Sequence, residues 1–201
     1  MTRTSTTYAA LLKDENKCSP YTIYNGKLVK LDYDNLDNLG PAASINSSVN
    51  DLSHWLLLQL ANGKFEGKEI ISADAIKNTR LPRSVAGAGT SGLYKSQHFN
   101  LYGLGWFLSD VKGYKQVTHT GGLEGIVTQV TLLPELNLGI VVLTNQQSGA
   151  AFNAITNTIK DAFLKIEYKD YVTMYSQREK DNVAKADKIT TEVWAKIEEN
   201  Q

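Results

Sequence analysis

The stretch His119–Asn145 reads HTGGLEGIVTQVTLLPELNLGIVVLTN and decides the fold. It belongs to a region with four runs rich in β-branched, aliphatic and aromatic residues, which predict four strands: Tyr102–Val111, Gln116–His119, Gly125–Leu133 and Leu138–Thr144. Short turns such as Lys112-Gly113 and Pro134–Asn137 separate these runs. Because a parallel pair of strands needs a long crossover, such short connections predict an antiparallel sheet in the middle of the chain.

Turn and cap signals organise the sequence before this sheet. Asn25-Gly26 lies between two short extended runs and predicts a β-hairpin. Ser48 or Asn50 can cap a helix that ends at Asn62-Gly63, and a second, shorter helix is expected to begin at Ser72. The glycine-containing segment Arg83–His98 has little periodicity and predicts an exposed loop.

Two helices are predicted after the sheet. Apolar residues recur at helical spacing along Ala150–Ile166, which indicates an amphipathic helix. The charge-rich segment Lys169–Asn200 contains no glycine or proline and predicts a long, mostly solvated helix. It reaches Gln201 without a stop signal, so we expect a continuation that is missing from this chain.

Composition excludes several classes of protein. The 201 residues carry 21 Lys+Arg and 21 Asp+Glu, so the formal net charge is zero, which argues against a general nucleic-acid or membrane-surface binder. No apolar run approaches the roughly 18 residues that a membrane span needs. The single cysteine, Cys18, cannot form an internal disulfide and is interpreted as a small loop or core residue. No residue cluster suggests a metal or an organic cofactor.

The ordered set of motifs resembles the serine β-lactamase and penicillin-binding-protein superfamily. It is most similar to the class C β-lactamase-related branch, which includes D-amino peptidases and carboxyl esterases. The strongest match is His119-Thr-Gly-Gly-Leu-Glu-Gly125, followed by Leu133-Pro-Glu135 and Leu138–Asn145. Gly40–Leu52 looks like the branch's glycine-rich turn into a helix, and Tyr102–Trp106 looks like its strand before the third motif.

The resemblance implies an α+β fold in which helices flank an antiparallel sheet. Residues 1–166 would form the carboxyl-terminal portion of a β-lactamase-like serine hydrolase domain, hence a partial β-lactamase/transpeptidase-like fold. Residues 167–201 would form a charged helix that leads toward an absent C-terminal domain. A longer parent protein would be periplasmic or secreted, and the start of this chain looks like the family's stretch after its second motif.

The resemblance also implies a mechanism. These enzymes attack a carbonyl with a serine that a nearby Lys and Tyr activate, and a third motif holds the substrate and donates one oxyanion N–H. Carried over, His119 would be catalytic and bind a small-molecule or peptide substrate, together with Thr120 and Gly121. The N–H of Gly122 would be the oxyanion donor. His119 in place of the family's Lys hints away from an efficient β-lactamase, because a histidine is only partly charged near neutral pH.

The other family motifs have no convincing counterpart in this chain. Ser109-Asp-Val-Lys112 has the Ser-x-x-Lys letters but sits at a strand end just before His119, so Ser109 is rejected as the nucleophile. Tyr33-Asp-Asn35 lies in a polar loop, and Ser44-Ile-Asn46 falls in the glycine-rich turn. The chain is therefore expected to show no hydrolase activity alone. The alternative is a non-catalytic binding or assembly module that uses an exposed sheet edge, including self-association.

Overall fold

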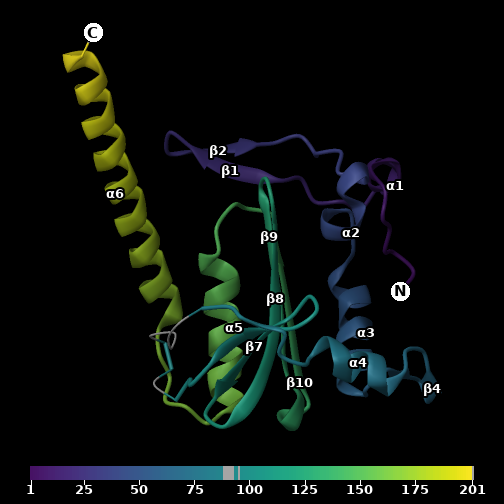
Figure 1. The fold of residues 1–201 in the computed structure, drawn as a ribbon. Helices are drawn as coiled ribbons and strands as arrows, with labels where there is room; N and C mark the ends of the chain where they lie inside the picture. Colours follow the sequence, from purple (N-terminus) through teal and green to yellow (C-terminus); the bar gives the residue numbers. More distant parts are fainter. Residues whose placement is uncertain (88–92, 95, 201) are drawn as a thin grey trace. The chain divides into compact units, whose positions relative to one another are not determined.

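The computed structural model describes residues 1–87, 93, 94 and 96–200, which fall into two compact units, Met1–Gln147 and Ser148–Gln201. The first unit contains a six-stranded sheet in the order β10-β9-β8-β7-β6-β5, in which every pair is antiparallel (Figure 1). Its strands are β5 (Ser84–Val85), β6 (Asn100–Tyr102), β7 (Phe107–Val111), β8 (Tyr114–Leu123), β9 (Ile126–Leu133) and β10 (Leu138–Thr144). The predicted antiparallel sheet and the α+β class are both confirmed.

Two strand boundaries differ from the prediction. The run Tyr102–Val111 is not one strand, because the chain turns between β6 and β7 at Gly105, whose φ is +76°. The His-Thr-Gly-Gly segment does not end a strand either. β8 continues through it to Leu123, and Gly121 and Gly122 pair in register with Thr128 and Val127 of β9. Gly121 fits this position because a Cβ there would lie 2.7 Å from Thr128 Oγ1.

Helix α3 (Val49–Leu60) closes one face of this sheet. Ser48, one of the two predicted caps, caps the helix by accepting the N–H of Asp51. Leu56 of α3 packs in the core with Trp106, Leu108, Val117 and Leu132. Gly139 of β10 lets the helix approach, since a Cβ there would lie 3.2 Å from Leu56 Cβ. The predicted second helix, α4 (Ala73–Thr79), begins after its cap Ser72.

Asp51 ties the start of the chain to α3. Its carboxylate accepts the N–H groups of Thr2 and Arg3 and the hydroxyl of Thr4, the last at 2.7 Å. The hydrogen bond from Thr4 is the main reason that the pKa of Asp51 lies below its ordinary value. The sequence signal, an acidic residue in a first helical turn, did not reveal this tertiary role.

The N-terminal segment holds the predicted hairpin and three short helical elements that were not predicted. β1 (Tyr21–Tyr24) and β2 (Lys27–Lys30) pair across Asn25-Gly26, whose φ angles are +49° and +72°. The unpredicted elements are short: α1 (Tyr8–Lys13), the 3-10 turn η1 (Asp37–Leu39) and α2 (Gly40–Ala43). Cys18 is free and exposed between α1 and β1.

The segment predicted as a loop, Arg83–His98, is only partly described. It begins with β5, which pairs with β6, so the loop prediction is wrong for Ser84 and Val85. Of the three glycines on which that prediction rested, Gly87 is exposed and outside any strand, and Gly89 and Gly92 lie outside the described residues. A small hairpin of β3 (Lys64–Phe65) and β4 (Lys68–Glu69) connects α3 to α4, and the turn η2 (Pro134–Leu136) connects β9 to β10.

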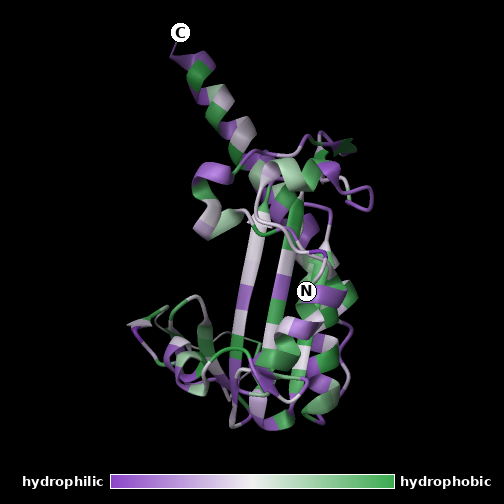
Figure 2. Ribbon diagram, turned by 90° about the vertical axis from the view of Figure 1, so that its right-hand side faces the viewer, coloured by the Kyte–Doolittle hydropathy of each residue, from purple (hydrophilic) through white to green (hydrophobic). Residues whose placement is uncertain are grey.

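The second unit is a pair of helices, α5 (Ala150–Phe163) and α6 (Tyr171–Glu199), as predicted. They are joined by hydrogen bonds from Asn157 to the Tyr175 hydroxyl and from the Tyr171 hydroxyl to Asp161. Beyond Tyr175, every described residue of α6 is exposed, and Figure 2 shows hydrophilic and hydrophobic residues interspersed along the helix. No helix in the described part of the chain is long and apolar enough to cross a membrane.

Candidate active-site edge

The backbone of β8 offers hydrogen-bonding groups at an uncovered edge. Val130 O accepts the hydroxyl of Thr118, and Val127 O accepts the hydroxyl of Thr144, both at 2.7 Å. The carbonyl of Val130 therefore faces β8, and that of Val127 faces β10. Because backbone groups alternate in direction along an antiparallel strand, Gly122, which pairs with Val127, turns its N–H and C=O away from β9.

The neighbouring strand on that side ends too early to cover them. The pairing of β7 with β8 stops at Phe107 and Thr118. Thr120 lies two residues before Gly122, so its backbone groups point to the same side of β8. The N–H and C=O groups of both residues therefore point past the end of β7. Among the described residues, no strand pairs with this part of β8 on the side opposite β9, and Thr120, Gly121 and Gly122 are all exposed. We call Thr120–Leu123 the open edge of β8.

His119 is held at the start of the open edge by contacts within the chain. Its Nε2 lies 3.0 Å from the Tyr102 hydroxyl, and its Nδ1 lies 2.6 Å from the carbonyl oxygen of Thr120. A carbonyl only accepts, so a neutral ring with the proton on Nδ1 satisfies both contacts, with Tyr102 donating to Nε2. The ring also packs near Phe107, with centroids 5.4 Å apart.

This arrangement refines the role predicted for His119. Both ring nitrogens have partners, so a substrate group that reaches Nε2 has to replace the Tyr102 hydroxyl. Tyr102 and Phe107 were not predicted as site residues. Their contact with His119 spans 17 and 12 residues of sequence and depends on how β6, β7 and β8 align, which no local pattern encodes.

The residues rejected as counterparts of the family's other motifs have structural partners. Ser109 is buried in β7, where its hydroxyl accepts a hydrogen bond from Gln116 Nε2 at 3.1 Å. The Tyr33 hydroxyl donates to the carbonyl of Cys18. Ser44 donates to the carbonyl of Gly40, four residues before it, as in a helical turn. None of these contacts joins the open edge of β8.

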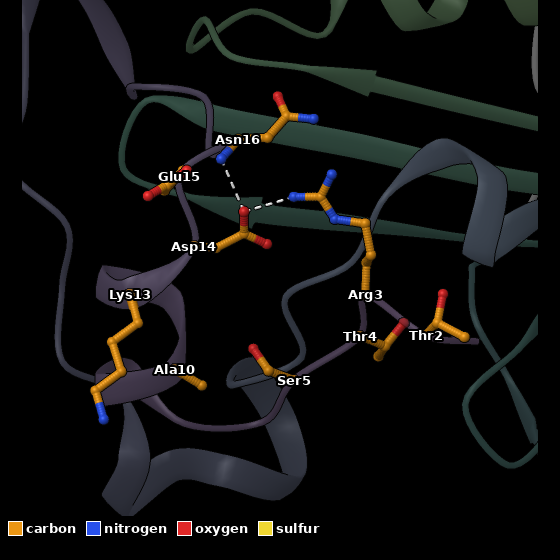
Figure 3. A pocket seen from close by; sticks show the side chains of 9 residues that line it. All are labelled: Thr2, Arg3, Thr4, Ser5, Ala10, Lys13, Asp14, Glu15 and Asn16. Atoms are coloured by element: carbon orange, nitrogen blue, oxygen red, sulfur yellow. Dashed lines mark hydrogen bonds and ion pairs between the residues drawn. The ribbon is translucent and has the colours of Figure 1, made fainter.

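Among the described residues of the first unit, two hollows stand out, and neither is lined by the predicted site residues. A hollow of about 560 Å³ lies beside the N-terminal segment, where Asp14 accepts from the Arg3 guanidinium and from the N–H of Asn16 (Figure 3). A second, of about 490 Å³, lies between α4 and the start of β8. Within residues 1–87, 93, 94 and 96–200, no three His, Cys, Asp or Glu side chains gather to hold a metal ion.

Comparison with known proteins assigns the fold and the family. The chain has a TM-score of 0.64 to the octameric penicillin-binding protein homologue from Pyrococcus abyssi, with 22% identity over 83% of this chain. It spans 35% of that protein's length. A D-stereospecific amidohydrolase from Streptomyces sp. gives a TM-score of 0.49, with 18% identity over 67% of this chain and 36% of that one.

A search of curated proteins gave no match. The beta-lactamase family, in contrast, matches residues 2–164, which include α3, the whole six-stranded sheet and the open edge of β8. This chain therefore belongs to the beta-lactamase family.

Proposed function

We propose that the open edge of β8 is the substrate-binding side of an acyl-transfer site in a serine hydrolase. The observation that carries the proposal is the outward backbone N–H of Gly122, at a position where no described strand competes for it. A preorganised backbone N–H is the group that stabilises the oxyanion of a tetrahedral intermediate. The N–H and C=O of Thr120, two residues earlier, can align an extended substrate beside it.

The side chains of the motif complete this proposal. Thr120 and Gly121 line the edge that the substrate approaches. His119 holds the Thr120 carbonyl through a hydrogen bond from Nδ1. A substrate group binds Nε2 of His119 in place of the Tyr102 hydroxyl. The substrates that fit the family and this chemistry are β-lactams, D-amino-acid peptides and esters. Choosing among them requires the rest of the substrate pocket.

The nucleophile and its base belong, in this proposal, to another part of the whole enzyme. Residues 1–166 then form the carboxyl-terminal portion of the catalytic domain, and 167–201 the helix that follows it. Removing a serine nucleophile and its base costs about 10⁶-fold in turnover, so this chain alone has no measurable activity.

The experiment compares two substitutions at one residue. In the whole enzyme, Gly122→Pro removes the N–H, whereas Gly122→Ala keeps it and places a Cβ 3.9 Å from Val127 Cγ1, an ordinary contact. We expect Pro to slow labelling by a fluorophosphonate probe about 10²–10³-fold, and Ala to leave the rate within a few-fold. The isolated chain serves as a control and is expected not to react.

Equal rates for the two variants would contradict the oxyanion role of Gly122. Covalent labelling of the isolated chain would contradict the assignment of the nucleophile to another segment.

A second function, assembly through the open edge, is favoured by the same uncovered backbone. Unpaired N–H and C=O groups at a sheet edge accept an added strand from a partner or from a second copy. The penicillin-binding protein homologue with the similar fold is described as octameric. A measurement of self-association by the 201-residue chain separates the two functions.

A further inference from the structure

Arg80 is a buried cation without a carboxylate partner. Arg80 directly follows α4 and is 7% exposed. Its Nη2 donates to the backbone oxygen of Gln59 at 2.9 Å and to Oε1 of the same residue at 2.7 Å. Its Nε is buried and has no acceptor among the described residues, and no ion pair to Arg80 occurs among them. A buried charge of this kind is costly unless an opposite charge compensates it.

A second cation lies beside it. Lys115, at the start of β8, donates from Nζ to the backbone oxygen of Arg80 at 3.0 Å. Burial and then the charge of Arg80 lower the pKa of Lys115, while Glu135 opposes this shift. The two cations therefore repel each other, and among the described residues Lys115 has no ion pair that offsets the repulsion.

Both cations line the hollow of about 490 Å³ between α4, the start of β8 and η2. Its wall also has an apolar part, formed by Ile76, Leu81 and Pro134. The same wall holds a third cation, Lys77, and two carboxylates, Asp74 and Glu135. The carboxylates oppose a ligand with more than one negative charge. The wall thus combines a site for one anionic group with an apolar surface.

We propose that this hollow binds an organic monocarboxylate, whose charged group compensates Arg80 and Lys115 and whose apolar body lies on Ile76, Leu81 and Pro134. Lys115 and Gly122 are seven residues apart on β8, which corresponds to about 23 Å at roughly 3.3 Å per residue. The hollow is therefore separate from the open edge, and the proposal does not depend on the hydrolase function.

The test measures binding of three probes to the full 201-residue chain by calorimetry, at constant ionic strength and pH 7. The probes are hexanoate, hexanol and inorganic phosphate. Hexanoate has both the charge and the apolar body, hexanol lacks the charge, and phosphate lacks the body. We expect hexanoate to bind with a millimolar Kd, and at least about tenfold more tightly than either of the others.

Two lysine variants locate the site. Lys115→Gln removes one of the three cations that line the hollow and is expected to weaken hexanoate binding about tenfold or more. Lys68→Gln, on the exposed strand β4 outside the hollow, is the matched control and should bind like the unmodified chain. Both substitutions replace a surface-reaching side chain, so a folded Lys115→Gln variant is expected even if Arg80 variants do not fold.

Three outcomes would overturn the proposal. Hexanoate binding that is undetectable, or equal in the two lysine variants, would show that the hollow is not the site. Binding of hexanol as tight as that of hexanoate would show a purely apolar pocket. Binding of phosphate as tight as that of hexanoate would show a general anion site without a role for the apolar wall.

Discussion

At the scale of single residues, the pair Tyr102 and His119 decides how the open edge is presented. The imidazole bridges a hydroxyl from β6 and a carbonyl of β8, at 3.0 and 2.6 Å. Each ring nitrogen therefore has one defined hydrogen-bonding role, which selects one neutral tautomer. The Thr120 carbonyl, which would otherwise point freely from the edge, is held by the preceding side chain.

Tyr102→Phe tests this arrangement. Loss of the hydroxyl leaves Nε2 without its donor, while the Thr120 carbonyl still holds the proton on Nδ1. We therefore expect the Nε2 resonance to move to that of an acceptor nitrogen without a hydrogen bond, the Nδ1–H form to persist, and the unfolding free energy to fall by about 1 kcal/mol. The nitrogen chemical shifts of the His119 ring measure both the hydrogen bond and the tautomer. Tyr33→Phe removes a hydroxyl that donates to the Cys18 carbonyl and serves as the control. Unchanged His119 shifts in Tyr102→Phe would contradict the assigned hydrogen bond.

At the scale of elements, the turn between β8 and β9 connects the sheet to the N-terminal hairpin. Gly125 O accepts the N–H of Tyr21, and Gly125 N donates to Oε1 of Gln147, whose own N–H donates to Tyr21 O. The hairpin β1–β2 is thereby placed at the end of the sheet where the open edge of β8 lies (Figure 1). A close approach of backbone segments requires glycine at position 125.

Two glycine substitutions separate this contact from simple backbone strain. Gly125 and Gly113 have similar φ angles, +74° and +84°, in two-residue turns of the same sheet. A Cβ at Gly113 meets nothing within 4 Å, whereas one at Gly125 would lie 2.6 Å from Tyr21 N and 2.7 Å from Pro20 Cβ. Both alanine variants lose roughly 1–2 kcal/mol to the positive φ.

We expect Gly125→Ala to lose about 1–3 kcal/mol more than Gly113→Ala, because overpacking adds to the strain. Urea unfolding measures the difference. Hydrogen exchange should also show that amides of β1 and β2 exchange faster only in Gly125→Ala. Equal stability of the two variants would mean that the hairpin is not held at this turn.

Sequence patterns predicted those elements that local chemistry determines. Asn25 and Gly26 tolerate the positive φ angles that a tight hairpin turn requires, so this pair predicts a hairpin. Ser48 and Ser72 are favourable N-cap residues and predict where α3 and α4 begin. The course of β8 was not predictable in this way. Glycines usually weaken a strand, and only the register with β9 explains why Gly121 lies inside one.

The candidate site was predictable to the same extent. The motif letters of His119–Gly122 predicted the segment, because its residue types are those that a substrate-binding strand needs. The partner Tyr102 and the cation pair Arg80 and Lys115 were not predictable, because each contact joins residues that are far apart in sequence. Such contacts follow from tertiary packing, which leaves no short-range pattern.

At the scale of the whole molecule, the sheet combines a formed core with an uncovered edge. Val117 and Leu132 at its centre are fully buried, while Leu123, six residues beyond Val117 on β8, is 39% exposed. A sheet with a stable core keeps its strands extended, so the open edge of β8 stays available as a template for another strand. The isolated chain is therefore expected to self-associate through the open edge.

Leu123→Lys tests this expectation, because a lysine at a sheet edge disfavours the addition of a strand by charge repulsion between copies. Sedimentation velocity of the 201-residue chain should show dimers or larger species that increase with concentration, and Leu123→Lys should shift them to monomer. Leu12→Lys, at a leucine of α1 that is 45% exposed, adds the same charge away from the edge and should leave the distribution unchanged. Two results would exclude the open edge as the contact: a chain that stays monomeric at every concentration, or dissociation by Leu12→Lys that equals the dissociation by Leu123→Lys. Either result would leave acyl transfer as the function that the uncovered backbone supports.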